Sequence, residues 1–296
     1  MPRIFGILRP DGEPGRIEGL ERSVAHAGLT KIQDLEMPIF LAVAKDHEIR
    51  VDLSSDRETT ILIRDRQFPD ERSLHPSGSP PGDMIEARNA NLTELDGAWT
   101  HLRFSSSDAE QRLAIDRFGQ HRLVFSQTRD GQLVFASDID TLRCHQGLET
   151  PLSAQAIYHY LFFHVIPSPG SIYKGIGKQP AAHQLIFNGS GYRLQRYWTA
   201  EFSTILNGPA AEKRSSVGPF VNSAVKRCGT TPDTGAFLSG GLDSSTVCGS
   251  LQSFQKQPTK AFSVGFDAEG FDETKYAEAA ARHFGLDHHV HYITPQ

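Results

Sequence analysis

Short apolar runs separated by turn residues fill the first two thirds of the chain, and this pattern predicts a domain built mainly from β-strands. The expected strands cover residues 4–8, 39–44, 60–63, 99–104, 112–115, 123–125, 133–136 and 192–198. Two hairpins are expected, and the second contains Asp130-Gly131, a strong turn signal between apolar runs. One helix is predicted over residues 153–163, with Ser153 as its N-cap.

The pattern changes after Asn207-Gly208-Pro209, where strands begin to alternate with helices. Helices are expected over residues 210–226, 244–254 and 273–284, and strands over residues 234–238, 260–264 and 288–293. Gly218-Pro219 is expected to weaken or restart the first of these helices. Strands that alternate with helices predict a parallel sheet with right-handed crossovers. The sequence therefore divides into two expected domains, residues 1–205 and residues 206–296.

The composition is that of a soluble globular protein, with 38% apolar and 22% charged residues. The net charge of −5 argues against a general nucleic-acid binder, because phosphate neutralisation needs a basic face. The sequence has no run of about 18 apolar residues and no secretory signal, so we expect a cytoplasmic protein that binds no membrane. Cys144, Cys228 and Cys248 lie too far apart for a metal-ligand or disulfide pattern and are expected to be reduced thiols.

The strongest chemical signal is the glycine loop Ser239-Gly240-Gly241-Leu242-Asp243-Ser244-Ser245, which lies between an expected strand and an expected helix. Paired glycines let the backbone approach an anion closely, and free N–H groups at a helix start favour a phosphate. The hydroxyls of the three serines add donors. Asp243 would repel a bare phosphate, so we expect it to hold Mg²⁺. The loop is neither a Walker loop nor a dinucleotide motif, and the alternative interpretation is a turn that only caps a helix.

This loop resembles the pyrophosphatase loop of asparagine synthetase-type enzymes. Further stretches that resemble the family follow in the same order, namely Ala261-Phe262-Ser263-Val264-Gly265-Phe266, Phe271-Asp272-Glu273-Thr274, Tyr276-Ala277 and Gly285-Leu286-Asp287-His288-His289. The resemblance implies ATP and Mg²⁺ as cofactors, with Asp243 as the magnesium ligand. The nucleotide-binding residues that it implies are Leu238, Ser239, Gly240, Gly241, Leu242, Asp243, Ser244, Ser245, Val264 and Gly265. The implied reaction is adenylation of a carboxylate, release of pyrophosphate and attack by an amine.

The first domain resembles the glutamine amidotransferase domain that precedes the synthetase domain in this family. The matching stretches are Ile4-Phe5-Gly6-Ile7, Leu95-Asp96-Gly97, Ile115-Asp116-Arg117-Phe118-Gly119, Leu133-Val134-Phe135-Ala136-Ser137-Asp138 and residues 167–176. The resemblance implies an Ntn-hydrolase-like αββα sandwich. It is followed by a partial Rossmann-like parallel α/β domain of the ATP-pyrophosphatase type, similar to adenine nucleotide α-hydrolases.

The glutaminase active site departs from the family pattern. The nucleophilic cysteine that the family carries at position 2 is replaced here by Pro2, and no cysteine precedes Cys144. The family's Asn-Gly-Glu stretch is also missing, while Asp116 and Arg117 remain and are interpreted as structural. We therefore expect no catalytic residue for glutamine hydrolysis. Nitrogen would come from free ammonia or from an amine on the substrate.

The chain ends at Gln296, whereas synthetase domains of this type run a few hundred residues beyond the loop. The expectation is a fragment, a truncated gene product, or half of a site that a second chain completes. Three functions stay open: an amide ligase acting on aspartate or another carboxylate, a β-lactam or lasso-peptide type cyclase, and a non-catalytic scaffold. A small-molecule substrate is the expected partner, with a homodimer or a completing second chain as further expectations.

Three histidines near the end of the chain, His288, His289 and His291, raise the question of a metal site. We interpret them as structural, because no cysteine or cluster of acidic ligands accompanies them. In addition, His288 and His291 would point to opposite faces of the expected strand, since strand side chains alternate.

Overall fold

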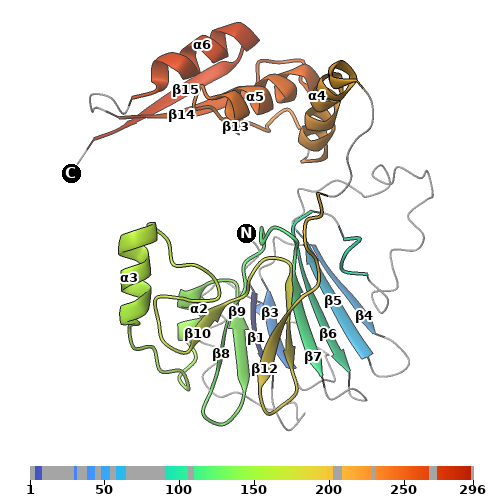
Figure 1. The fold of residues 1–296 in the computed structure, drawn as a ribbon, viewed down its shortest axis with the longest axis vertical. Helices are drawn as coiled ribbons and strands as arrows, with labels where there is room; N and C mark the ends of the chain where they lie inside the picture. Colours follow the sequence, from blue (N-terminus) through green and yellow to red (C-terminus); the bar gives the residue numbers. More distant parts are fainter. Residues whose placement is uncertain are drawn as a thin grey trace. The chain divides into compact units, whose positions relative to one another are not determined.

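A computed structural model describes residues 4–8, 30–31, 39–43, 48–53, 58–64, 91–95, 97–105, 110–202, 209–228, 231–266 and 272–294. The chain divides into two compact units, of which the first runs to Ala200 and the second begins at Glu201 (Figure 1). The boundary expected between residues 205 and 206 falls outside the described residues. No described helix is long and apolar enough to cross a membrane.

The N-terminal unit is built from two antiparallel sheets. The first has the order β10 (Ile176–Lys178), β8 (Val124–Gln127), β9 (Leu133–Ala136), β1 (Ile4–Leu8), β3 (Ile39–Val43) and β2 (Thr30–Lys31). The second has the order β12 (Tyr192–Arg196), β11 (His183–Phe187), β7 (Gln111–Ile115), β6 (Trp99–Ser105), β5 (Glu58–Arg64) and β4 (Glu48–Leu53). Figure 1 shows strands of the two sheets as neighbouring layers.

The two sheets share one hydrophobic core. It is formed by fully buried side chains from the facing sides of both sheets, among them Ile4, Leu8, Phe125 and Phe135 from the first and Ile61, Phe104, Leu113 and Leu185 from the second. Side chains that alternate along each strand explain this arrangement, because every second residue points into the space between the sheets. Gly6 makes room for an aromatic ring, since a Cβ there would lie 2.1 Å from Cζ of Phe135.

The outer face of the first sheet is also buried. Phe5 and Ile7 of β1 pack there with Leu142 of the short helix α2 (Ile139–Arg143). Strand β1 is therefore buried on both faces, which explains why Ile4-Phe5-Gly6-Ile7-Leu8 is a continuous apolar run rather than an alternating one.

Most expected elements of this unit are confirmed, including both hairpins, β6 with β7 and β8 with β9. Helix α3 (Ala154–Phe163) begins at the expected N-cap, where the Ser153 hydroxyl accepts a hydrogen bond from the backbone N–H of Ala156 at 3.3 Å. Elements absent from the prediction are β2, β4, β10, β11 and α2. The predicted fold class is confirmed, because two stacked antiparallel sheets are followed along the chain by a parallel α/β unit.

The C-terminal unit is a parallel sheet with helices. Strands β13 (Ala236–Phe237), β14 (Lys260–Phe266) and β15 (Asp287–Ile293) pair in sequence order. Helix α5 (Leu242–Phe254) connects the first two strands, and α6 (Thr274–Phe284) connects the last two. Helix α4 (Ala210–Arg227) packs beside α5 and continues through Pro219, where the sequence suggested a weak point.

One face of this sheet is covered and the other is open. Ala261, Ser263 and Gly265 of β14 are buried, whereas the alternate residues Phe262, Val264 and Phe266 are exposed by 41%, 45% and 44%. The buried face joins a small core with both helices, formed by Leu238, Cys248, Ala261, Ala277 and Ala281. The position of the site follows from this asymmetry.

Candidate functional site

The glycine loop begins where β13 ends. The backbone N–H of the buried Leu238 donates to the carbonyl of Phe262 at 2.8 Å, which extends the pairing by one residue. Gly240 then adopts a φ of +81°, and a Cβ at this position would lie 2.4 Å from the backbone nitrogen of Ala277. Both features require glycine, so the chain reverses direction in direct contact with the start of α6.

Helix α5 starts without a side-chain cap. Gly241 is its N-cap residue, and no side-chain hydrogen bond closes this terminus. The first N–H groups of any helix lack acceptors within the helix, and the helix dipole places partial positive charge on them. The terminus therefore offers donors of the kind that bind a phosphate, which the backbone at Gly240 and Gly241 can approach closely.

The hydroxyls of Ser239 and Ser244 form hydrogen bonds within the glycine loop. The Ser239 and Ser244 hydroxyl oxygens lie 3.0 Å apart, and Ser244 Oγ also accepts from the Ser239 N–H at 3.1 Å. Gly241 N–H donates to Ser239 Oγ at 3.3 Å, and Ser245 N–H donates to the Gly241 carbonyl at 3.1 Å. The sequence suggested these hydroxyls as phosphate donors. In the structure, the Ser239 and Ser244 hydroxyls form a small network that holds the two ends of the loop together.

Asp243 is the second residue of α5, and its side chain is exposed beside the loop. Among the described residues, no group of three or more histidine, cysteine, aspartate or glutamate side chains could hold a metal ion. Mg²⁺ is commonly bound through one or two carboxylates, with waters and substrate phosphates completing its shell. A single exposed carboxylate beside a helix start that offers N–H donors fits that donor set.

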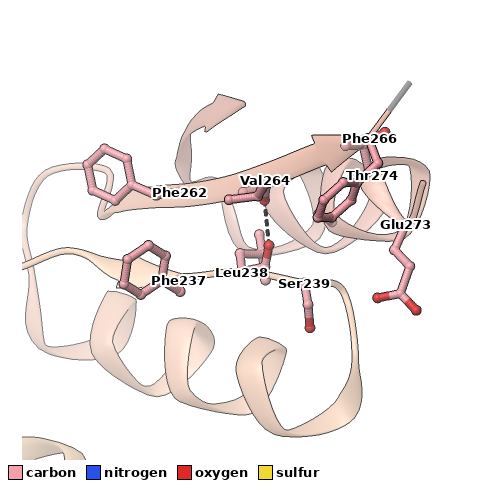
Figure 2. Close-up of a pocket in the computed structure, with 10 residues that line it drawn as sticks. Phe237, Leu238, Ser239, Phe262, Val264, Phe266, Glu273 and Thr274 are labelled. Carbon is pink, nitrogen blue, oxygen red and sulfur yellow. Dashed lines mark hydrogen bonds between the residues drawn. The ribbon is translucent and has the colours of Figure 1, made fainter. Parts of the chain in front are cut away.

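A pocket of about 260 Å³ opens next to the loop (Figure 2). Its lining residues are Phe237, Leu238, Ser239, Phe262, Ser263, Val264, Phe266, Glu273, Thr274 and Ala277. Leu238, Ser239 and Val264 are the predicted site residues among them. Residues 240–245 form the adjoining turn and helix start instead. Gly265 points to the covered face, where a Cβ would lie 2.5 Å from the ring of Tyr292.

The pocket has two chemically different ends. Figure 2 shows the rings of Phe237 and Phe262 at one end, and at the other the Ser239 hydroxyl and the Glu273 carboxylate, on the same side as Phe266. The polar end therefore lies on the side of the glycine loop. A ligand with one apolar and one anionic part matches this division.

Sequence reasoning missed Glu273 and Thr274 as site residues. They start α6, where Asp272 accepts hydrogen bonds from the Thr274 N–H at 3.2 Å and the Thr274 hydroxyl at 2.8 Å. The family-like stretch that contains them was the available signal. Phe262 and Phe266 were also missed, although alternation along β14 places them on the same face as the predicted Val264.

The histidines of β15 serve separate contacts. His288 Nε2 lies 2.7 Å from Ser263 Oγ on the covered side of the sheet. His289 Nε2 lies 3.1 Å from a carboxylate oxygen of Asp287, and its ring stacks on Phe262 with centroids 5.4 Å apart. Neighbouring histidines of the strand thus lie on opposite faces.

In the N-terminal unit, the side chains of Asp116 and Arg117, which lie in a stretch that resembles the family, form hydrogen bonds to backbone groups. The buried Asp116 carboxylate accepts hydrogen bonds at 2.8–3.0 Å from the backbone N–H groups of Phe118, Gln120 and His121. Arg117 Nη2 donates to the carbonyl of Thr93 at 2.6 Å. These contacts agree with the structural role expected for both residues. Pro2, the residue at the expected nucleophile position, lies outside the described residues.

Two family models match the chain in separate segments. The asparagine synthase model covers residues 219–296, and the glutamine amidotransferase domain model covers residues 84–198. The putative asparagine synthetase [glutamine-hydrolyzing] 2 of Methanocaldococcus jannaschii is 30% identical over 210 residues, which are 68% of this chain and 40% of that relative. Asparagine synthetase [glutamine-hydrolyzing] 1 of Bacillus subtilis is 26% identical over 208 residues, which are 69% of this chain and 32% of that protein.

A third relative has a different kind of name. The amidase chyE of Penicillium rubens is 28% identical over 217 residues, which are 64% of this chain and 32% of the relative. The chain thus spans between 32% and 40% of the length of these three relatives. A solved glutamine phosphoribosylpyrophosphate amidotransferase from B. subtilis aligns with 99% of this chain and 69% of its own, at 13% identity and a TM-score of only 0.36.

Proposed function

This chain belongs to the asparagine synthase family, and we propose that its C-terminal unit binds Mg-ATP and uses it to activate a carboxylate. The asparagine synthase family uses ATP. The observation that carries the proposal is the uncapped start of α5 beside a pocket with one polar and one apolar end. ATP would supply the adenylate group that makes a carboxylate oxygen a good leaving group.

The glycine loop is proposed to hold the phosphates. Backbone N–H groups in the first turn of α5, at residues 242–244, offer donors without a charged side chain, and Gly241 leaves space for an anion beside them. Asp243 would repel this anion unless a cation lies between the two. We therefore propose that Asp243 would hold Mg²⁺, whose charge would offset that of the phosphates.

The apolar end of the pocket is proposed to hold the base. Phe237, Phe262 and Val264 supply an aromatic and aliphatic wall from adjacent strands. The pocket volume of about 260 Å³ lies just below the range of about 300–1,000 Å³ that is typical of ligand sites. This size suits a base with its sugar, while the phosphates would extend along the glycine loop outside the pocket.

The N-terminal unit is proposed to lack glutaminase activity. Its only cysteine is Cys144, and that thiol donates to the carbonyl of Asp140 at 3.4 Å at the end of α2. Cys144 is an internal residue whose own nitrogen is part of a peptide bond, so it has no α-amino group of its own to act as the base that the family chemistry uses. Ammonia or an amine of the substrate would then supply nitrogen. An assay for glutamate release from glutamine tests this, and release above a heat-denatured control contradicts it.

Aspartate is the proposed carboxylate, because two of the three relatives described above are named asparagine synthetases. The third relative is named an amidase, so the names of proteins similar to this chain are not all those of asparagine synthetases. Pyrophosphate release from Mg-ATP with aspartate and ammonia tests the substrate. Release with other amino-substituted carboxylates, and none with aspartate, would favour the cyclase alternative.

Calorimetric titration of the chain with ATP, with and without Mg²⁺, tests nucleotide binding. We expect wild-type protein to bind only with Mg²⁺, and Asp243→Ala to weaken binding about tenfold, or about 1.4 kcal/mol. Asp233→Ala is the matched control, because this exposed carboxylate lies in the same unit, outside the glycine loop and the pocket lining, and pairs with Lys260 at 3.8 Å. Equal affinity of wild type and Asp243→Ala would contradict the role of Asp243, and no binding by wild type would contradict the proposal.

A further inference from the structure

A series of side-chain hydrogen bonds leads from β15 to Leu238, the residue directly before the glycine loop. The Ser263 hydroxyl on β14 donates to the Leu238 carbonyl at 2.5 Å, the contact drawn as a dashed line in Figure 2. His288 Nε2 on β15 lies 2.7 Å from the same hydroxyl oxygen. This series of hydrogen bonds therefore links all three strands of the sheet at the point where β13 ends.

The direction of these bonds sets the state of the histidine. The Ser263 hydroxyl has one hydrogen, and it is donated to Leu238. The same oxygen can then only accept from His288, so Nε2 of that ring carries a hydrogen. Both backbone groups of Leu238 are held, since its N–H also donates to the Phe262 carbonyl at 2.8 Å.

The residue held in this way is the last one before the loop turns. Leu238 and Ser263 are 2% and 6% exposed, so a carbonyl left without its partner there would be costly. Leu238, Ser239 and Ser263 all line the pocket. A shift of the Leu238 carbonyl would move the Ser239 backbone, and with it the hydroxyl pair that closes the loop.

We propose that His288 is a positioning residue that acts through Ser263 to fix the glycine loop for its ligand. The inference rests on the proposed nucleotide site, although His288 is outside the set of residues lining the pocket. Its role is to hold the Ser263 hydroxyl in the one orientation that serves Leu238. A glutamine can reproduce the donor, because its side-chain amide carries N–H groups at a similar reach, whereas alanine cannot.

The test compares His288→Ala, His288→Gln and the control His283→Ala, all in the full chain. His283 is exposed in the last turn of α6 and away from the pocket. Backbone hydrogen exchange of the peptide containing Leu238 and Ser239 is measured without ligand, and Mg-ATP affinity is measured by calorimetry. Loss of one net hydrogen bond corresponds to about a three- to tenfold change. We expect His288→Ala to speed exchange and weaken Mg-ATP by this factor, and His288→Gln to restore both.

The outcomes separate this inference from the proposed function. If wild type binds Mg-ATP while His288→Ala leaves affinity and exchange unchanged, the positioning role is wrong and nucleotide binding stands. If wild type binds no Mg-ATP but His288→Ala speeds exchange and glutamine reverses it, the role in holding the loop stands and the proposed function fails. If the alanine and glutamine variants lose Mg-ATP affinity equally, and hydrogen exchange is faster throughout the unit, the cause is a general packing defect and the inference is overturned. Ser263→Ala is expected to reproduce His288→Ala, and the double variant to add nothing further.

Discussion

The central strands of the two units differ in how they are covered. Strand β1 of the N-terminal unit has all five residues buried, with apolar partners on both faces. Strand β14 of the C-terminal unit alternates strictly between buried and exposed residues, and after Lys260 its exposed side chains, Phe262, Val264 and Phe266, are apolar. The same chain thus uses apolar residues for a closed core in one unit and for an accessible wall in the other.

The two cores also differ in the size of their side chains. The N-terminal core contains the fully buried rings of Phe104, Phe125 and Phe135. The C-terminal core contains mainly small residues, including Ala261, Ala277 and Ala281. Small residues contribute less burial energy but let backbones approach closely, as Gly240 does against α6. The comparison teaches that the first unit is built for stability and the second for close placement of a loop against a helix.

The largest effect is expected from Phe135→Ala in the N-terminal core. The ring is fully buried and packs directly over Gly6. Removing a buried phenylalanine side chain costs about 3–5 kcal/mol, because transfer energy is lost and a cavity forms. Urea unfolding followed by tryptophan fluorescence measures it, since Trp99 and Trp198 are the only tryptophans and both lie in this unit.

The control for this change is Phe118→Ala, whose ring is 73% exposed and which is expected to cost less than about 1 kcal/mol. Circular dichroism reports both units, so a second transition unaffected by Phe135→Ala would separate their stabilities. If Phe135→Ala and Phe118→Ala cost the same, the contrast between a closed and an open unit is wrong.

A smaller effect is expected at the glycine loop, where Gly240→Ala and Gly241→Ala form a matched pair. Alanine at 240 would require a φ of +81° and would place Cβ 2.4 Å from backbone atoms of residues 276 and 277. Left-handed backbone alone costs about 1–2 kcal/mol for alanine, and the contact adds to it. At Gly241 the φ is −72° and the nearest atom is Ser239 Oγ at 3.4 Å.

We therefore expect Gly240→Ala to lower the stability of the C-terminal unit by about 2 kcal/mol or more and to abolish Mg-ATP binding. Gly241→Ala should keep the fold, with at most a modest loss of affinity. Thermal unfolding by circular dichroism and calorimetry check both. Similar behaviour of the two variants would show that α6 does not approach the loop as closely as the structure has it.

Much of the fold followed from periodicity. The apolar run of β1, the Asp130-Gly131 hairpin and the strand–helix alternation after residue 209 have strong local signals, and all are found. The missed β10 and β11 lack such signals, because Lys178, Gln179 and Gln184 interrupt their apolar pattern. Their place is set by long-range contacts, such as the Gln179 side-chain amide, which donates to the Leu113 carbonyl at 3.0 Å.

The candidate site was only partly predictable. Local sequence identified the glycine loop, because its conformation depends on residues that are adjacent in the chain. Glu273 and His288 reach the same region from α6 and β15, and nothing local in the sequence reports that approach. Gly265 was expected with Val264, and of these two residues Val264 lines the pocket whereas Gly265 is outside its lining.

The smallest change, one that leaves the fold intact, is alkylation of the cysteines in the C-terminal unit. Cys248 is fully buried in the small core and its thiol donates to the Phe237 carbonyl at 3.7 Å, whereas Cys228 is exposed at the end of α4. Burial raises the pKa of the Cys248 thiol, so less of it is the reactive thiolate at a given pH. Iodoacetamide at pH 8, followed by mass spectrometry of peptides, should modify Cys228 first.

Reaction of Cys248 requires local opening, and an opening that costs about 3 kcal/mol slows it on the order of a hundredfold. The rate of Cys248 alkylation therefore measures how rarely the core of small residues opens. This core covers one face of the sheet, whereas Phe262, Val264 and Phe266 leave the other face exposed. Mg-ATP should slow Cys248 further by stabilising the closed form, and Cys228 should not respond. Equal rates at both thiols would mean that the C-terminal unit is open on both faces of its sheet, and the contrast between the two units would then extend to the packing of the helices.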